Sequence, residues 1–336
     1  MSKTRCLVLC GTLAAYRYAL LLDEAFPEYD FECYVDEADT IKAPRQFAAL
    51  KAKVVEHSLE RLLFSVGDYT HLILIDPRSK ASSKVLPLIF QRLGKMRIAI
   101  EHELFPTPRA TGKAVSADYE MSCLTSGILN PVGVQNTDAK GVIGVTTGRL
   151  EGILPASTLN RFRRSILDLA HSLPTQRFLW RPHPDEFVAQ DGYYRYLHRD
   201  VARDTISVLE LDQANDPLEE FISNIDLLIA LPSTAAMLAQ DAGFPTLVFA
   251  DPGVADPKVA MFSDIRVSDT QAMLAGIERA RGETASEAKP TPWRPFDTKY
   301  FRGLVERDAK SSEIPRENQI LAALEINNWV TGNGFD

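Results

Sequence analysis

The stretch LLIALPSTAAMLAQDAGFPTLVFA, residues 227–250, holds two short apolar runs on either side of a segment rich in helix-forming residues. Ser233 follows the first run, where a serine commonly caps a helix, and Gly243 stands where a glycine commonly ends one. Pro245 then leads into the second run. A buried strand, a helix and a second buried strand in succession are typical of parallel α/β layers. The stretch therefore predicts one strand–helix–strand unit.

The same alternation of apolar runs and helical segments extends over most of the chain. In the first half we expect strands at CLVLC (6–10), FECYVDE (31–37), HLILID (71–76), MRIAIEHE (96–103) and MSCLTSGI (121–128). Helices are expected between them at about residues 13–26, 44–65 and 82–93. In the second half we expect strands at VIGVTTG (142–148), RFLW (177–180), ISVLELD (206–212), LLIAL (227–231) and TLVFA (246–250), with helices at about 157–173, 191–203, from 216 onward and at 233–243. Such a series predicts parallel sheets covered by helices.

The chain is long enough for two domains, because 336 residues exceed the usual size of one hydrophobic core. The segment NPVGVQNTDAKG, residues 130–141, is polar and rich in turn-forming residues, and it separates the two series. We therefore expect an α/β protein with two Rossmann-type domains, residues 1–135 and 136–290. The tail, residues 291–336, has a helical stretch at 315–328 and is expected to cross back to the first domain.

Composition and charge narrow the class of protein. The net charge of −8 argues against general nucleic-acid binding, which needs a dominant basic surface. Lys3 and Arg5 precede an apolar run that imitates a signal peptide, but polar and aromatic residues at 16–18 interrupt it. The sequence contains no run of 18 or more apolar residues, so it predicts no membrane-spanning helix. All four cysteines lie in the first 123 residues without a second close pair, which favours reduced thiols in a cytoplasmic protein over a zinc site.

Three strand ends in the second half carry residues suited to an anion, and ligands of open parallel sheets bind at the carboxyl ends of strands. Thr147, Gly148 and Arg149 follow the first strand of this half. Arg181-Pro182-His183-Pro184 follows the next strand, where two prolines stiffen a loop that aims an imidazole. Ser233 and Thr234 open a helix whose first amides suit a phosphate. The alternatives are an ordinary turn, a packed histidine and a capped helix.

The first half offers acidic residues at its strand ends. They are Asp36 and Glu37, Asp76, and the cluster Glu101-His102-Glu103. A carboxylate beside a histidine can take the proton of an acceptor hydroxyl, so we expect the catalytic base among Glu101, Glu103 and Asp36, with His102 beside it. Gly11 and Thr12, at the first strand–helix turn, are expected to face the same site. The alternative is that these acids are solvated strand ends.

RPHP (181–184), combined with DLLIAxPSTAAxxAxxAGxP (226–245), resembles the nucleotide-binding half of GT-B glycosyltransferases. The closer likeness is to bacterial capsule and surface-polymer enzymes with an HP motif and a Ser/Thr motif: polysialyltransferases, other sialyltransferases, Kdo transferases and teichoic-acid glycerophosphotransferases. The resemblance covers residues 141–250 and implies two domains that face a cleft. It also implies that His183, Ser233 and Thr234 contact the phosphate and cytidine of a CMP- or CDP-activated donor, with Arg181 in support. Asp241 stands one position from the glutamate that binds ribose in many GT-B enzymes.

The resemblance implies a glycosyltransferase of capsule or lipopolysaccharide biosynthesis, which transfers a CMP-linked acidic sugar to a glycan or lipid-linked acceptor. No Asp-x-Asp pair is present, so we expect no metal and no cofactor beyond the donor nucleotide sugar. The alternatives are a CDP-glycerol-type phosphotransferase, a UDP-sugar 2-epimerase on the same fold, and a catalytically silent nucleotide-binding subunit. The basic residues Arg161, Arg163 and Arg164 are compatible with peripheral association at the inner face of the membrane, or with a plain solvated helix face.

Overall fold

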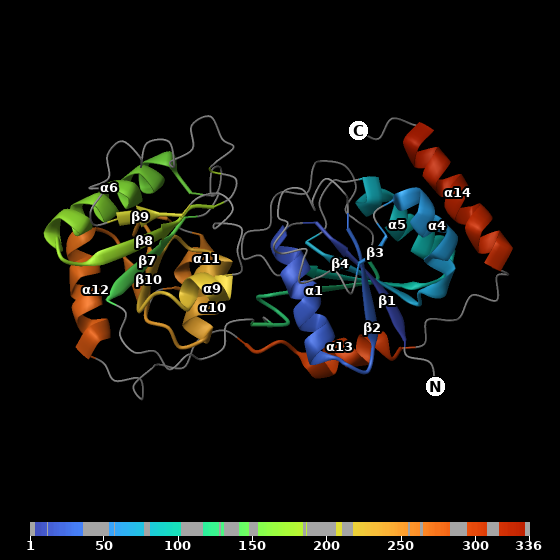
Figure 1. Cartoon of the computed structure of the whole chain (residues 1–336), viewed down its shortest axis with the longest axis horizontal. Helices are drawn as coiled ribbons and strands as arrows, with labels where there is room; N and C mark the ends of the chain where they lie inside the picture. Colours follow the sequence, from blue (N-terminus) through green and yellow to red (C-terminus); the bar gives the residue numbers. More distant parts are fainter. Residues whose placement is uncertain are drawn as a thin grey trace. The chain divides into compact units, whose positions relative to one another are not determined.

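The computed structural model describes residues 4–11, 13–35, 54–56, 58–76, 81–101, 117–127, 129–130, 141–147, 154–183, 186, 206–209, 218–254, 256–262, 265–282, 294–307 and 316–332. The chain divides into two compact units (Figure 1). Unit 1 consists of Met1–Leu129 together with Arg294–Asp336, and unit 2 of Asn130–Trp293. The division thus lies a few residues before the boundary expected from the sequence, and the C-terminal segment belongs to unit 1.

Unit 1 contains a parallel sheet with the strand order β3-β2-β1-β4-β5-β6. Its strands are β1 (Arg5–Cys10), β2 (Asp30–Tyr34), β3 (Val54–Glu56), β4 (His71–Ile75), β5 (Met96–Glu101) and β6 (Tyr119–Ser122). Its helices are α1 (Leu13–Ala25), α4 (Leu59–Ser65), the 3-10 helix η2 (Val66–Asp68), α5 (Ala81–Arg92), α13 (Thr298–Val305) and α14 (Arg316–Gly332). The order is that of a Rossmann sheet.

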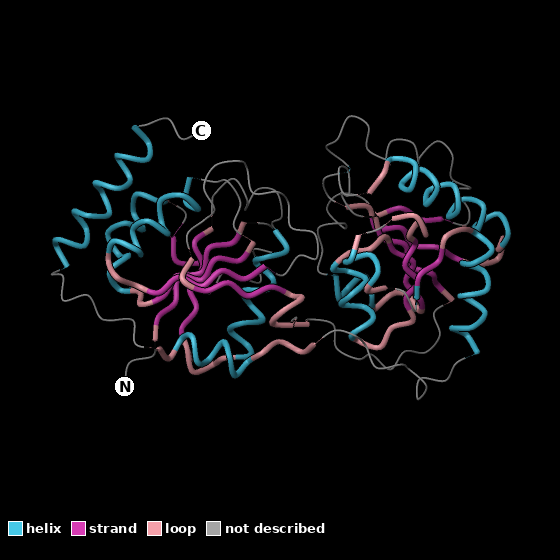
Figure 2. Tube along the Cα trace, turned by 180° about the vertical axis from the view of Figure 1, so that it is seen from behind, coloured by secondary structure: helices cyan, strands magenta, loops and turns pink. Residues whose placement is uncertain are grey.

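Unit 2 repeats this order, since its sheet runs β12-β11-β10-β7-β8-β9 and all its pairs are parallel. Its strands are β7 (Val142–Thr146), β8 (Arg177–Arg181), β9 (Ile206–Val208), β10 (Leu227–Ala230), β11 (Thr246–Phe249) and β12 (Arg266–Val267). Its helices are α6 (Ala156–Ser172), α9 (Leu218–Ile222), α10 (Thr234–Asp241), α11 (Pro257–Ala260) and α12 (Thr270–Gly282). The chain therefore contains two parallel α/β domains, with helices on both faces of each sheet (Figure 2).

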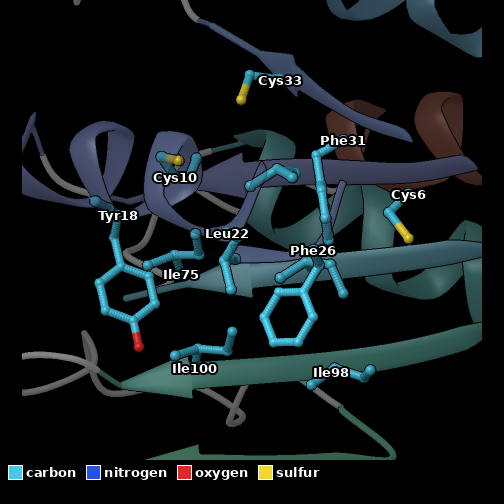
Figure 3. Packing of buried hydrophobic residues seen from close by; sticks show 14 of the residues in the cluster. Cys6, Cys10, Tyr18, Leu22, Phe26, Phe31, Cys33, Ile75, Ile98 and Ile100 are labelled. Carbon is cyan, nitrogen blue, oxygen red and sulfur yellow. The ribbon is translucent and has the colours of Figure 1, made fainter. Parts of the chain in front are cut away.

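The core of unit 1 consists of two apolar layers, one on each face of the sheet. Alternate residues of β1 enter opposite layers: Val8 packs with Phe26 and Phe31, whereas Leu7 packs with residues of α4 and α5. Figure 3 shows the first layer, in which side chains of β1, α1, β2, β4 and β5 gather. Because both faces are covered, its strands are apolar throughout rather than alternating.

The C-terminal segment completes both layers of unit 1. Phe301 of α13 is fully buried, and its ring centroid lies 4.8 Å from that of Phe26, which follows α1. Phe296 joins the same cluster, and Ala323 of α14 is buried in the opposite layer. Residues near the C-terminus therefore cover apolar surface that the first 129 residues would otherwise leave exposed.

One expected helix is wrong. Residues 44–65 were predicted to form a continuous helix, but Val54–Glu56 forms the edge strand β3 and the helix α4 begins only at Leu59. The β-branched pair Val54-Val55 favours a strand. Ser58 then caps α4, because its side chain accepts a hydrogen bond from the amide of Arg61. The expected helix at 191–203 and most of the polar segment 130–141 lie outside the described residues.

Two predictions from the sequence were that the cysteines of unit 1 are reduced thiols and that no helix spans a membrane. All four cysteines are buried free thiols. Among the described residues, no helix combines the length and the apolar character needed to cross a bilayer.

Candidate functional site

The carboxyl ends of three adjacent strands of unit 2 bring the predicted phosphate-binding residues to one edge of its sheet. Thr146, the last residue of β7, is in register with Arg181 of β8 and with Ala230 of β10. Adjacent strands lie about 4.8 Å apart. Thr147, His183 and Ser233 follow these three strand ends, so they lie on neighbouring strands at the same edge.

A buried glutamate that the sequence analysis did not single out links two of these loops. Glu186 is 3% exposed. Its Oε2 accepts a hydrogen bond of 2.5 Å from the hydroxyl of Thr147 and one of 2.8 Å from the amide of His183. The amide of Glu186 in turn donates to the carbonyl of His183 at 2.9 Å. The hydroxyl of Thr147 thus donates to a carboxylate of the protein.

Ser233 is the N-cap of α10, as its position in the sequence predicted. Its side chain accepts a hydrogen bond from the amide of Ala236 at 3.3 Å. Ser233, Thr234 and Ala235 are half-buried, which leaves the first turn of α10 partly accessible. The amides at the start of a helix have no acceptor within the helix and lie at the positive end of its dipole. This helix start is therefore suited to an anion.

Arg181 lies on the face of the sheet that α9 covers. Its guanidinium carbon is 5.8 Å from the centre of the Phe221 ring. A Cβ at Gly144, on the same face of β7, would lie 2.4 Å from Cδ1 of Ile225, so a larger residue here would require the side chains of α9 and the following residues to shift. Thr146 shares this face, is buried, and has a hydroxyl with no hydrogen-bond partner within the part of the chain that the structure describes.

Asp241 lies apart from the other predicted ligands. It is the last residue of α10, about 10 Å along the helix from Thr234 at 1.5 Å per residue. Its Oδ2 accepts a hydrogen bond of 2.8 Å from the side-chain amide of Asn130, which also donates to the carbonyl of Leu238. The structure therefore gives this carboxylate a partner at the start of unit 2 and does not group it with His183.

The basic face of α6 is partly used inside the protein. Arg161 forms an ion pair of 2.8 Å with Asp251, which follows β11, and also donates to the carbonyl of Ser268. Asp251 accepts a further hydrogen bond from the hydroxyl of Thr158. These contacts hold the first turns of α6 against the end of β11, so Arg161 has a structural role on this face.

Unit 1 places three predicted residues on adjacent strand ends. The amide of Gly11, after β1, donates to the carbonyl of Ile75, and the amide of Asp76, after β4, donates to the carbonyl of Ile100. Glu101 is the last residue of β5 and is half-buried. Gly11, Asp76 and Glu101 thus line the same edge of this sheet.

Asp76 has two unusual properties. It is 6% exposed, and its backbone is left-handed with a φ of 44°, the only positive φ of a non-glycine residue among the described positions. Burial raises the pKa of the Tyr18 hydroxyl, and the nearby charge of Asp76 raises it further. A buried acid held in a strained backbone at a strand end is typical of functional sites.

The remaining predicted site residues lie outside the described part of the chain. They are Thr12, Asp36, His102, Glu103, Gly148 and Arg149. Their roles stay predictions. The described residues contain no group of three His, Cys, Asp or Glu side chains placed to bind a metal ion, and the expectation that the protein needs no metal stays a prediction as well.

No protein-family model matches the chain, and no curated protein sequence matches it. Solved structures do resemble it. A protein assigned as a UDP-N-acetylglucosamine 2-epimerase from Listeria monocytogenes has a TM-score of 0.59 at 14% identity, over 94% of this chain and 98% of that one. The UDP-GlcNAc 2-epimerase of Methanocaldococcus jannaschii, in complex with UDP-GlcNAc and UDP, has a TM-score of 0.54 at 11% identity, over 95% and 99%. The Neisseria meningitidis enzyme bound to UDP-GlcNAc has a TM-score of 0.51 at 12% identity, over 98% and 100%. At these identities the likeness concerns the fold, and it confirms two parallel-sheet domains of the GT-B type.

Proposed function

We propose that the protein is a nucleotide-sugar enzyme whose donor binds at the carboxyl edge of the unit 2 sheet. The observation that carries the proposal is the placement of His183, Thr147 and the start of α10 on three neighbouring strand ends. The first-turn amides of α10 would hold one phosphate, because a helix N-terminus favours anions. His183 would hold a phosphate oxygen through a charge-assisted hydrogen bond, with Arg181 adding positive charge nearby.

For the reaction we propose epimerisation at carbon 2 of a UDP-N-acetylhexosamine, in preference to sugar transfer from a CMP-linked donor. Two of the similar structures are UDP-GlcNAc 2-epimerases with UDP-GlcNAc bound, and one of them holds UDP as well. Inverting carbon 2 requires that a base removes its proton while the bond between carbon 1 and the UDP oxygen breaks, so that the electron pair forms a C1–C2 double bond. UDP then adds back to carbon 1 as a proton returns to the opposite face of carbon 2. Unit 1 offers two carboxylates for these steps on adjacent strand ends, Asp76 and Glu101. We assign the proton transfers to this pair.

Transfer of a CMP-linked acidic sugar is the second candidate. The sequence favours it, because RPHP combined with the Ser/Thr motif at 232–234 resembles enzymes with CMP- or CDP-activated donors. In that reaction the acid of unit 1 would take the proton of an acceptor hydroxyl. The two candidates place the nucleotide on the same residues of unit 2 and differ in the base, the acceptor and the fate of carbon 2.

Proton exchange at carbon 2 distinguishes the two reactions. The full-length protein is incubated with UDP-GlcNAc in D2O without an acceptor, and the sugar is followed by NMR. Epimerisation gives the 2-epimer with deuterium at carbon 2, and this product disappears in Asp76→Asn and His183→Ala. A parallel incubation uses CMP-sialic acid with and without a glycan acceptor. Release of CMP that depends on the acceptor, with no exchange in UDP-GlcNAc, would replace the epimerase assignment by the transferase.

A further inference from the structure

We propose that Glu186 is a positioning residue of the nucleotide site, which holds the His183 backbone and the Thr147 side chain in the arrangement that receives a phosphate. The proposal rests on the proposed nucleotide site of unit 2, though not on which of the two reactions occurs there.

The carboxylate of Glu186 is buried and accepts hydrogen bonds from two donors of the proposed site. Glu186 is 3% exposed, and a buried carboxylate is costly unless hydrogen-bonded or paired with a positive charge. Its Oε2 accepts from the Thr147 hydroxyl and from the His183 amide. Hydrogen bonds to an ionised acceptor are about twice as strong as neutral ones. One oxygen atom therefore ties the loop after β7 to the loop after β8.

The spacing of His183 and Glu186 in the sequence matches a known capping pattern. In a capping box, a glutamate three residues after the first helix-capping residue accepts the backbone amide of that residue. Glu186 has this spacing and this bond relative to His183, and its own amide donates back to the His183 carbonyl. Both backbone polar groups of His183 are thus bonded to the same residue. His183 can then move only together with Glu186, which fixes the point from which the imidazole extends.

The bond to Glu186 also limits which hydrogen bonds Thr147 can form with a ligand. Its position in the sequence makes Thr147 a candidate anion ligand, but its hydroxyl proton is donated to Glu186. An oxygen whose only proton is already donated can accept a hydrogen bond but cannot give one to a phosphate. Thr147 therefore supports the site by orienting Glu186, and contact with the anion is left to His183 and the start of α10.

The chain offers a matched control for Glu186. Asp226 is another acidic residue whose carboxylate accepts a backbone amide, that of Val142 at 2.8 Å. Val142 is the first residue of β7, whereas Thr147 follows its last, so the two carboxylates support opposite ends of the same strand. Loss of either removes a carboxylate–amide bond from unit 2. Only the loss of Glu186 acts at the proposed site.

The test measures binding of UDP, CMP and inorganic phosphate by calorimetry, together with the unfolding midpoint, for full-length wild type, Glu186→Ala, Glu186→Gln and Asp226→Ala. We expect Glu186→Ala to weaken binding of the nucleotide by about tenfold or more, as is usual when a partner that orients a binding histidine is lost. Glu186→Gln should restore affinity to within about threefold, because one amide oxygen can accept both hydrogen bonds. Asp226→Ala should lower the midpoint and leave the affinity unchanged.

A milder pair of variants tests the same network without removing the buried carboxylate. Thr147→Val removes the hydroxyl donor and should weaken nucleotide binding, whereas Thr147→Ser keeps the donor and should not. In the double variant with Glu186→Ala the two losses should not add, since both break one network.

The results separate the inference from the function on which it rests. If wild type binds a nucleotide and Glu186→Ala binds it equally well, or if Asp226→Ala loses as much affinity, Glu186 is merely structural and the inference is overturned. If wild type binds none of the three probes, the nucleotide site itself is wrong and both proposals fall.

Discussion

Replacing Asp76 by glycine should make unit 1 more stable than replacing it by alanine, while both changes abolish the reaction. Both variants lack the carboxylate that we assign to proton transfer, so both should be inactive. They differ in how well each residue tolerates the backbone of position 76, whose φ is 44°. The comparison therefore separates the strain at this position from the chemistry of the side chain.

The expected difference follows from two opposing effects. A left-handed backbone costs a residue with a Cβ about 1–2 kcal/mol, a cost that glycine does not bear. Glycine loses more conformational freedom on folding, which costs about 0.5–1 kcal/mol relative to alanine. The hydrogen bond from the amide of residue 76 to the Ile100 carbonyl is a backbone bond and persists in both variants. The glycine variant should therefore be more stable by about 0.5–1 kcal/mol.

Calorimetry measures this difference as a shift of the unit 1 transition. In a domain of this size 1 kcal/mol changes Tm by about 2–4 °C, so Asp76→Gly should unfold about 1–4 °C above Asp76→Ala. The unit 2 transition should stay at the wild-type temperature in both variants and provides an internal control. Activity is followed as deuterium incorporation at carbon 2 of UDP-GlcNAc.

Two results would refute the reasoning separately. A glycine variant that unfolds below the alanine variant would mean that position 76 is not strained by its left-handed backbone. A glycine or alanine variant that still exchanges the carbon 2 proton would mean that Asp76 is not the base, and Glu101 would become the candidate.

Two further predictions concern the stability of unit 1. Phe301→Ala should destabilise this unit by about 3–5 kcal/mol, because Phe301 is fully buried against Phe26. Tyr300→Ala in the same helix removes a side chain that is 40% exposed, so it should cost about 0.5 kcal/mol or less. Urea unfolding of both variants checks this, and equal losses would contradict the packing of α13 on unit 1. Burial lowers the pKa of His71 from 6.5 to about 4, so the unfolded chain binds the proton more readily than the folded one. The free energy of unfolding of unit 1 should therefore fall by up to about 3 kcal/mol as the pH falls from about 6.5 to 4. In His71→Asn the urea midpoint should depend less on pH over this range. An unchanged dependence on pH would mean that other groups cause the loss of stability.

The sequence permitted prediction of the fold wherever a strand is buried on both faces. The runs at 6–10, 72–75 and 227–231 are apolar without interruption because helices cover both sides of each sheet, and such runs correspond to β1, β4 and β10. The edge strand β3 has no such signal, since Val54–Glu56 is only three residues long and is followed directly by a helix. Its pairing with β2 depends on residues distant in the sequence, which no local pattern contains.

The same distinction applies to the candidate site. Strand-end positions could be read from the chain, so His183, Thr147, Ser233 and Glu101 were identified in advance, but what each side chain contacts depends on neighbouring loops. Asp241 was selected because it stands one position from the ribose-binding glutamate of many GT-B enzymes, and its partner is Asn130, more than a hundred positions earlier. The strain at position 76 likewise arises where β4 meets β5 and has no signature in HLILID.

Glu186 is the exception, because the sequence did contain a signal for it. A glutamate three positions after His183 fits the spacing of a capping box, a rule that needs no tertiary information. The stiffness of RPHP restricts the loop to few conformations, but stiffness alone does not select one of them. The carboxylate of Glu186 selects one by bonding the amide of His183 and the hydroxyl of Thr147, so the aim of the imidazole depends on a residue that need never touch the ligand.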